Sequence, residues 1–288
     1  GEFWVKNFVY TLNNIDYPIN TIIIQNCTLR LGEDARIRVR GLSKLILKGC
    51  LVESCSTSTM WDGLYVDIYD QAVTEPELEI TEYVTTSTRT TIRDAKNALV
   101  LRRDSPFDIN KCDFEDNYVD VLMEKYNKTN NSSKIFNCSF DFTAFNDPTF
   151  ADHKRAAFEL NDIESFTIGE AVNGSENIIE NSLYGIYSNN SNFKLLNTEI
   201  HDILDDQTTS DLEGSCIASF SDFDFNDRLI EIGDGNASGE NFFSNSENGI
   251  TGAGDMNYEI KRNTFGNEND VSESILKYCI SLDNNNSL

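Results

Sequence analysis

The feature of this chain that most limits its possible folds is an internal repeat. Residues 176–186 and 240–250 align without gaps and share the frame Glu-Asn-hydrophobic-hydrophobic-x-Asn-Ser-x-x-Gly-Ile. Repetition of this kind is the signature of solenoid and propeller folds, in which each repeat is one supersecondary unit. The fold must therefore place equivalent positions of successive repeats in equivalent environments.

Two shorter frames recur along the chain. The first is hydrophobic-x-x-Cys-x-hydrophobic, in which Thr or Asn later replaces the cysteine. Its central residues are Cys27, Cys50, Cys112, Cys138, Thr198 and Asn263. The second is a small residue followed by a large hydrophobic one. Its copies are Gly63-Leu64, Ala98-Leu99, Ala157-Phe158, Gly185-Ile186, Cys216-Ile217 and Gly249-Ile250. Residues Val119 to Val121 fill the gap between the second and third copies. Successive spacings are then about 22–37 residues, which is typical of a β-solenoid coil with variable insertions.

These frames predict stacked parallel strands. Short β-branched and aromatic runs separated by Asn, Asp and Gly indicate an all-β chain. One coil cannot bury its hydrophobic side alone, so coils stack, and equivalent strands pair in parallel about 4.8 Å apart. A sandwich or propeller is disfavoured because Asn-Gly and Asp-Gly hairpin turns are scarce.

We therefore predict a right-handed parallel β-helix of roughly eight or nine coils with projecting loops. We expect one domain over residues 1–288, with N-terminal strands or a cap at 1–44 and repeating coils at 45–288. Asn26, Asn137 and Asn197 fall at turns, where their side chains can hydrogen-bond from one coil to the next.

Charge and composition exclude some functions. The chain carries 23 Lys and Arg against 48 Asp and Glu, a formal net charge of −25. Such a surface repels phosphate, so nucleic acid is not an expected partner. No apolar run reaches the ~18–20 residues of a spanning helix, so no transmembrane segment is predicted. Four of the seven cysteines occupy one repeat position, which favours small buried hydrophobes over a disulfide framework.

The densest local group of basic residues supplies the catalytic candidates. Arg102, Arg103 and Lys111 lie within ten residues of one another. A polysaccharide lyase needs a basic group that abstracts a proton from the sugar ring. The alternative is that these cations are simply the outward-facing positions of solenoid strands.

An alternating acidic segment supplies the candidates for a metal site. In residues 221–227, Asp222 and Asp224 share one strand face and Asp227 follows in the next turn. Carboxylate oxygens are preferred calcium ligands, although the segment lacks the loop of an EF-hand. Calcium is therefore the possible cofactor, and the alternative is a solvated strand face.

Aromatic residues near the projecting loops supply the candidates for ligand binding. Trp61, Tyr65 and Tyr69 could stack against sugar rings. Trp61 fits a core or cap position equally well. Loops held by a rigid scaffold are the usual place for recognition.

Residues 60–66, with Trp61 and Gly63 at their centre, resemble a segment of secreted right-handed β-helix proteins of the pectate-lyase-like superfamily. The chain is most similar to large bacterial surface proteins exported by the type IX route, and residues 35–41 resemble their early strand. The resemblance covers roughly residues 10–280 as fold. It implies a secreted or cell-surface protein that contacts carbohydrate. The polygalacturonase Gly-His-Gly and the lyase Arg-x-Pro-x-x-Arg patterns are absent.

Two hypotheses about function follow. The first is a non-catalytic extracellular module for adhesion or glycan binding, acting as a monomer or as part of a longer surface protein, with a glycan or a cell-surface molecule as partner. The second is a polysaccharide lyase or glycoside hydrolase that acts in a groove along the β-helix. A fold of this kind hosts both, so the fold alone does not choose between them.

Overall fold

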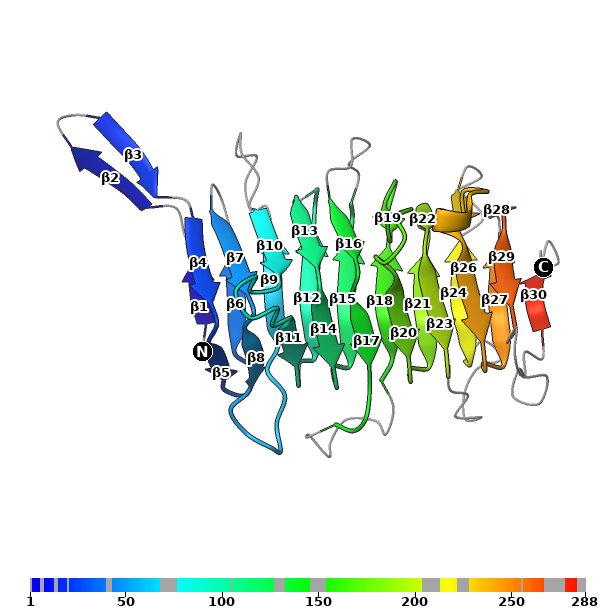
Figure 1. The fold of residues 1–288 in the computed structure, drawn as a ribbon, viewed down its shortest axis with the longest axis horizontal. Helices are drawn as coiled ribbons and strands as arrows, with labels where there is room; N and C mark the ends of the chain where they lie inside the picture. Colours follow the sequence, from blue (N-terminus) through cyan, green and yellow to red (C-terminus); the bar gives the residue numbers. More distant parts are fainter. Residues whose placement is uncertain are drawn as a thin grey trace.

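The computed structural model shows a right-handed parallel β-helix, as predicted (Figure 1). Each coil adds a strand to each of three sides, and every coil stacks on the one before it. The structure describes residues 2–5, 8–12, 15–19, 21–39, 43–67, 77–104, 106–126, 133–145, 154–203, 213–221, 228–254, 256–266 and 278–283.

Two long parallel sheets form two sides. The first has ten strands: β1 (Glu2–Val5), β6 (Arg36–Val39), β9 (Gly63–Asp67), β12 (Asn97–Arg102), β15 (Val119–Glu124), β18 (Ala156–Asn161), β21 (Tyr184–Asn189), β24 (Ser215–Ser221), β27 (Asn248–Gly254) and β30 (Tyr278–Asp283). The second has nine: β5 (Thr28–Leu31), β8 (Leu51–Ser54), β11 (Thr90–Arg93), β14 (Cys112–Glu115), β17 (Ser139–Asp141), β20 (Asn177–Glu180), β23 (Thr198–His201), β26 (Asn241–Ser244) and β29 (Asn263–Phe265).

The third side is split into two parallel sheets. A five-stranded sheet contains β4 (Thr21–Gln25), β7 (Lys44–Lys48), β10 (Glu77–Thr81), β13 (Phe107–Asn110) and β16 (Lys134–Phe136). A four-stranded sheet contains β19 (Thr167–Ile168), β22 (Phe193–Leu195), β25 (Leu229–Ile232) and β28 (Asn257–Ile260). Outside the parallel sheets lie an antiparallel hairpin of β2 (Phe8–Leu12) and β3 (Ile15–Ile19) and a short 3-10 helix, η1 (Ala237–Gly239).

The longest sheet has ten strands, slightly more than the predicted number of coils. The excess comes partly from the N-terminal segment. Strands or a cap were expected in residues 1–44. This segment already contains β4, β5 and β6, which pair with β7, β8 and β9 of the next coil.

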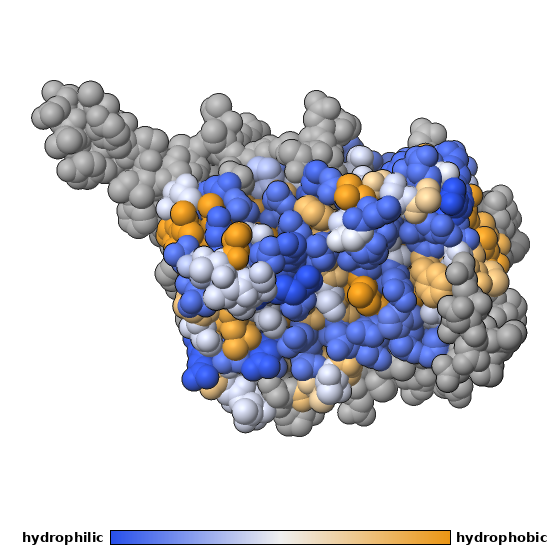
Figure 2. All heavy atoms as spheres, viewed as in Figure 1, coloured by the Kyte–Doolittle hydropathy of each residue, from blue (hydrophilic) through white to orange (hydrophobic). Residues whose placement is uncertain are grey.

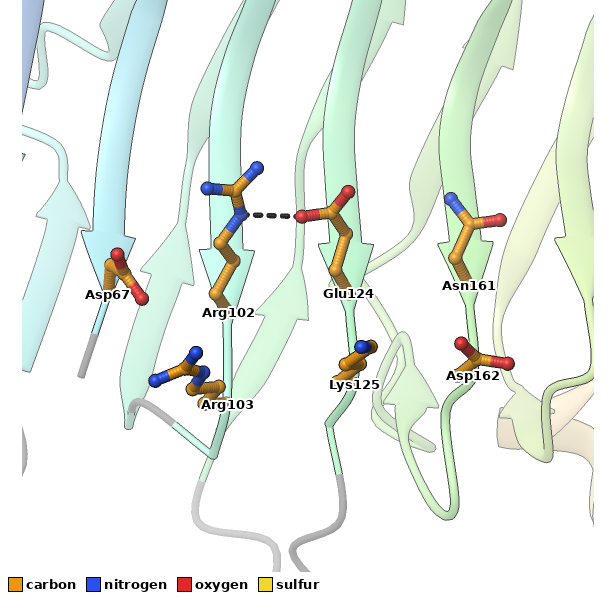
Figure 3. Close-up of a pocket in the computed structure, with 7 residues that line it drawn as sticks. All are labelled: Asp67, Arg102, Arg103, Glu124, Lys125, Asn161 and Asp162. Atoms are coloured by element: carbon orange, nitrogen blue, oxygen red, sulfur yellow. Dashed lines mark hydrogen bonds and ion pairs between the residues drawn. The ribbon is translucent and has the colours of Figure 1, made fainter. Parts of the chain in front are cut away.

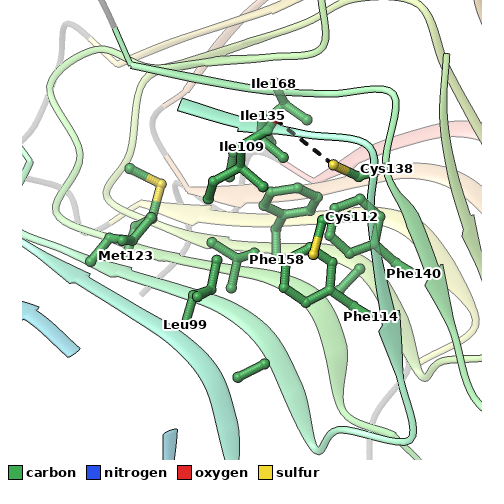
Figure 4. Close-up of a cluster of buried hydrophobic side chains, with 14 of the residues drawn as sticks. Leu99, Ile109, Cys112, Phe114, Met123, Ile135, Cys138, Phe140, Phe158 and Ile168 are labelled. Carbon is green, nitrogen blue, oxygen red and sulfur yellow. Dashed lines mark hydrogen bonds between the residues drawn. The ribbon is translucent and has the colours of Figure 1, made fainter. Parts of the chain in front are cut away.

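Both repeat frames mark inward-facing columns of the core. The large residues of the small-hydrophobic pairs lie in one register column of the ten-stranded sheet, from Leu64 to Ile250. Phe114 and Phe140 of the nine-stranded sheet stack with their ring centroids 5.0 Å apart (Figure 4). The ring centroid of Phe158, on the ten-stranded sheet, lies 4.9 Å from that of Phe140. Fully buried rings that stack from coil to coil hold the rod together.

The cysteine frame forms a column that continues as Thr and Asn. Its members in register order are Cys27, Cys50, Thr90, Cys112, Cys138, Asn177, Thr198, Asn241 and Asn263. All seven cysteines are free, and Cys50, Cys112, Cys138 and Cys216 are buried. The predicted role as small core side chains is confirmed for Cys50, Cys112 and Cys138, whereas Cys27, on the first coil of the column, is exposed.

The predicted turn asparagines and the asparagine ladder occupy neighbouring positions. Asn26, Asn137 and Asn197 have positive φ values of 47–54°, as turn residues that reverse the chain direction require. Asn197 makes the predicted bonds between coils, because its side-chain amide donates to the Val172 carbonyl at 2.9 Å and to Ser175 Oγ at 3.3 Å. A second ladder lies at the next position of the coil, where Asn241 donates to Asn263 at 2.8 Å. Its own amide oxygen accepts the Thr198 backbone N–H at 3.1 Å.

The outer surface is mostly polar. Figure 2 shows one side of the rod, on which hydrophobic residues are scattered among hydrophilic ones. Among the described residues, no helix is long and apolar enough to cross a membrane.

Candidate functional site

Three arginines surround one tyrosine on the outer face of the ten-stranded sheet. The guanidinium groups of Arg36 and Arg38 lie 5.3 Å from the centre of the Tyr65 ring, and that of Arg102 lies 5.7 Å away. They come from β6, β9 and β12, three neighbouring strands. Cations at such distances from a ring are attracted by its electron-rich face, so the four side chains hold one another in place. We call these four residues the Tyr65 cluster.

The Tyr65 hydroxyl is held as a hydrogen-bond donor. It donates to Asp62 Oδ2 at 3.1 Å. Burial, together with the nearby Asp62 carboxylate, raises the pKa of Tyr65 to about 12. The phenol therefore stays protonated at neutral pH, and it is suited to binding rather than to proton abstraction.

A hollow adjoins the Tyr65 cluster (Figure 3). It has a volume of about 450 Å³ and is lined by Asp67, Arg102, Arg103, Glu124, Lys125, Asn161 and Asp162. Arg102 Nε donates to Glu124 Oε2 at 2.5 Å. The hollow thus combines planar guanidinium, carboxylate and amide groups, which are the groups that proteins use to bind several hydroxyls or a carboxylate at once.

Strand register and turn geometry explain why these residues meet. Asp67, Arg102, Glu124 and Asn161 are register partners on successive strands, each near the strand end. The residue that follows three of these positions has a positive φ. These residues are Arg103 at 49°, Lys125 at 55° and Asp162 at 56°. The left-handed turn places their side chains beside the same hollow.

An aromatic group lies farther along the same face. Tyr187 packs against Tyr184 with ring centroids 5.2 Å apart, and against Phe220 at 5.3 Å. Arg155 lies over the Tyr187 ring at 4.9 Å. We call Tyr184, Tyr187 and Phe220 the Tyr187 shelf. The shelf belongs to a small cluster outside the main core, and its rings Tyr187 and Phe220 are partly exposed.

The structure brings together some of the predicted site residues and separates others. Tyr65, Arg102 and Arg103 are neighbours. Lys111 lies at a different corner, between the five-stranded and nine-stranded sheets, where it pairs with Glu82. Trp61 is fully buried, and its Nε1 donates to the Arg93 carbonyl at 2.8 Å. Its ring therefore packs in the core.

Tyr69, Asp222, Asp224 and Asp227 lie outside the described residues. The predicted calcium site thus stays a prediction. Within the part of the chain that the structure describes, one other group could hold a metal ion: one ligand atom each from Glu180, His201 and Asp202 lies within 4.8 Å of the others. His201 Nδ1 is 2.6 Å from Asp202 Oδ2, so the present contact is a hydrogen bond.

Asp94, which follows β11 of the nine-stranded sheet, is a buried carboxyl group that makes the free energy of unfolding depend on pH. Burial, reinforced by the Asp116 and Glu53 carboxylates, raises the pKa of Asp94 from 3.8 to about 6, although Arg93 lowers it. Asp94 is 4% exposed. Because the folded state holds this proton more tightly than the unfolded chain, ionisation of Asp94 costs stability at neutral pH.

We therefore expect the contribution of Asp94 to raise the free energy of unfolding as the pH falls from 7.5 to 4, by on the order of 2–3 kcal/mol. Urea unfolding at several pH values measures this change, and Asp94→Asn should flatten it. Asp34→Asn is the control, since Lys96 lowers the pKa of that exposed carboxyl and gives the opposite sign. An unchanged pH profile in Asp94→Asn would contradict the assignment.

Arg36, Arg38, Lys125 and the Tyr187 shelf were not among the candidates from sequence. A signal for Tyr187 was present, because it follows the inward-facing Ile186 of a repeat frame and so must point outward. Arg38 carries the same signal, as the outward neighbour of Ile37 and Val39. The position of Lys125 depends on a left-handed turn that no sequence frame marks.

Comparisons of this chain with protein-family models, with curated proteins and with solved structures found no significant match.

Proposed function

We propose that this protein is a non-catalytic extracellular β-helix module that binds a glycan, in adhesion at a bacterial cell surface. The observation that carries the proposal is the outer face of the ten-stranded sheet, where the Tyr65 cluster, the polar hollow and the Tyr187 shelf lie in line. Sugar rings are bound by a few aromatic faces for their C–H surfaces and by planar polar groups for their hydroxyls.

The spacing of the aromatic groups suits an extended chain. Tyr65 and Tyr187 occupy the same outward register column, with Val100, Leu122 and Glu159 between them. At one strand spacing per step, the two rings are about 19 Å apart along the rod. A linear oligosaccharide that lies along the rod would cross the strands and contact Tyr187 at one end and, at the other, the arginines that surround the buried Tyr65 ring.

The charges favour a glycan with anionic groups. The whole chain has a net charge of −25, but three cations, Arg102, Arg103 and Lys125, line the hollow and match its three carboxylates in number. Arg36 and Arg38 add two further cations around the adjoining Tyr65 ring. Guanidinium groups bind carboxylates and sulfates in a bidentate manner. A uronic acid or sulfated sugar placed in the hollow would find such partners.

A polysaccharide lyase is the second candidate function. Arg103, Lys125 and Asp162 line the hollow together with Arg102, and a lyase requires cations that neutralise a uronate and a base that removes its ring proton. The proposal of binding without turnover is preferred because Arg102 is paired with Glu124 and Tyr65 stays protonated.

We expect Arg102→Gln and Tyr187→Ala each to weaken glycan binding by about tenfold, which corresponds to about 1.4 kcal/mol. Each variant removes one contact of the proposed path, at the hollow or at the shelf. Isothermal titration with neutral, carboxylated and sulfated oligosaccharides measures the loss. Lys134→Gln is the matched control, because Lys134 is an exposed cation of the five-stranded sheet.

The same samples should be assayed for unsaturated and reducing ends. Binding that survives in both variants would place the glycan elsewhere and contradict the proposed site. If the wild-type chain releases product and Lys125→Gln does not, the protein is a lyase and not a binding module.

A further inference from the structure

A buried pair of opposite charges lies where the nine-stranded sheet gives way to the ten-stranded sheet. The side chains of Lys154 and Asp120 are both 0% exposed, and Lys154 Nζ lies against Asp120 Oδ2. Lysine and aspartate are almost never fully buried unless they are paired, because each charge loses its hydration. This pair joins two neighbouring coils, since β15 and β18 are adjacent strands.

The pair is enclosed by buried residues of the neighbouring coils. In the strand register, Ala98 and Ala157 lie on either side of Asp120, and both are fully buried. The one further hydrogen bond recorded for Lys154 Nζ within the described residues is long, 3.5 Å to the Asp141 carbonyl. The ammonium group and the carboxylate thus face mainly each other.

The two oxygens of Asp120 have different environments. Oδ1 accepts a hydrogen bond of 3.0 Å from Nδ2 of Asn117, which is itself fully buried. Oδ2 is buried and lies against the Nζ ammonium of Lys154. Asn117 therefore holds Oδ1, while Oδ2 is the oxygen that faces the amine.

We propose that Lys154 and Asp120 condense to an intramolecular isopeptide bond. One ammonium proton passes from Nζ to Oδ2, the neutral amine attacks Asp120 Cγ, a Nζ–Cγ bond forms, and the Cγ–Oδ2 bond breaks. Oδ2 leaves as water with two of the three ammonium protons, and the third proton stays on the amide nitrogen. The two opposite charges cancel, and no oxidant or other reactant is needed.

Three features of the site favour this step. Burial raises the pKa of Asp120 to about 6, against the lowering effect of Lys154, so the protonated acid that can lose water is accessible near neutral pH. Asn117 donates to Oδ1, the oxygen that remains, and stabilises the negative charge that develops there during attack. Lys154 stands two residues before β18, the strand that pairs with β15, and this holds the amine beside the carboxyl group and greatly raises its effective concentration.

The product would be a covalent link between coils. It would close the chain from residue 120 to residue 154 and replace a pair of buried charges by a neutral amide. Such a link suits a rod that must resist unfolding outside the cell, and it is independent of whether the outer face binds a glycan.

The test is the mass of the intact, denatured protein. We expect a mass about 18 Da below that calculated from the sequence, the loss of one water. Lys154→Arg and Asp120→Ala should each restore the calculated mass. Lys134→Arg, at an exposed ion pair with Glu170, should keep the deficit. Proteolysis of the wild-type protein should yield one branched peptide that contains residues 120 and 154.

A wild-type mass equal to the calculated value would overturn the proposal, and so would a deficit that persists in Lys154→Arg. The wild-type mass and the branched peptide decide the question even if a variant does not fold.

Discussion

Replacement of Trp61 by alanine is expected to lower the free energy of unfolding by about 3–5 kcal/mol. The indole is fully buried among core side chains, and its Nε1–H bonds to the Arg93 carbonyl. The substitution therefore leaves a cavity and an unsatisfied carbonyl group in the same place. Denaturant unfolding followed by circular dichroism measures the loss.

Val84→Ala is the matched control, because that side chain is 80% exposed and should change stability by less than about 0.5 kcal/mol. A Trp61→Ala protein that keeps its stability but no longer binds a glycan would place Trp61 in the ligand site instead of the core.

Gly63→Ala should be among the most damaging single-methyl changes at the glycines that the structure describes. Gly63 has a φ of +142°, and a Cβ built there would lie 1.8 Å from the Asn97 carbonyl oxygen on the neighbouring strand. Because that obstacle is backbone, β9 and β12 would have to separate. We expect a loss of at least about 3 kcal/mol or failure to fold.

Gly174→Ala separates this steric effect from backbone strain. Gly174 also has a positive φ, +78°, but nothing lies within 4 Å of the added Cβ. We expect this control to cost about 1 kcal/mol. Equal losses in the two variants would show that Gly63 is required only for its backbone conformation.

The sequence predicted the core more completely than the surface. The small-hydrophobic pairs and the cysteine frame identify inward-facing columns because stacking forces equivalent positions into one register. The split of the third side into five-stranded and four-stranded sheets was not predicted. The hydrophobic alternation is the same on both sides of that break, so no sequence signal marks it.

The candidate site was predicted in part for a similar reason. Arg102 and Tyr65 face outward because of strand alternation, and register makes them neighbours although 37 residues separate them. Lys111 is closer to Arg102 in sequence, but the chain turns a corner between them. Proximity in sequence misled there, whereas register along the rod brings distant residues together.

We propose that the outer face of the ten-stranded sheet binds a glycan without cleaving it. The most direct test is titration of the wild-type chain with an oligosaccharide panel that includes uronic acid and sulfated sugars, with product release followed in the same samples. We expect saturable binding to an anionic oligosaccharide, with no unsaturated or reducing ends released. Absence of binding to every member of the panel, or release of cleaved product, would contradict it.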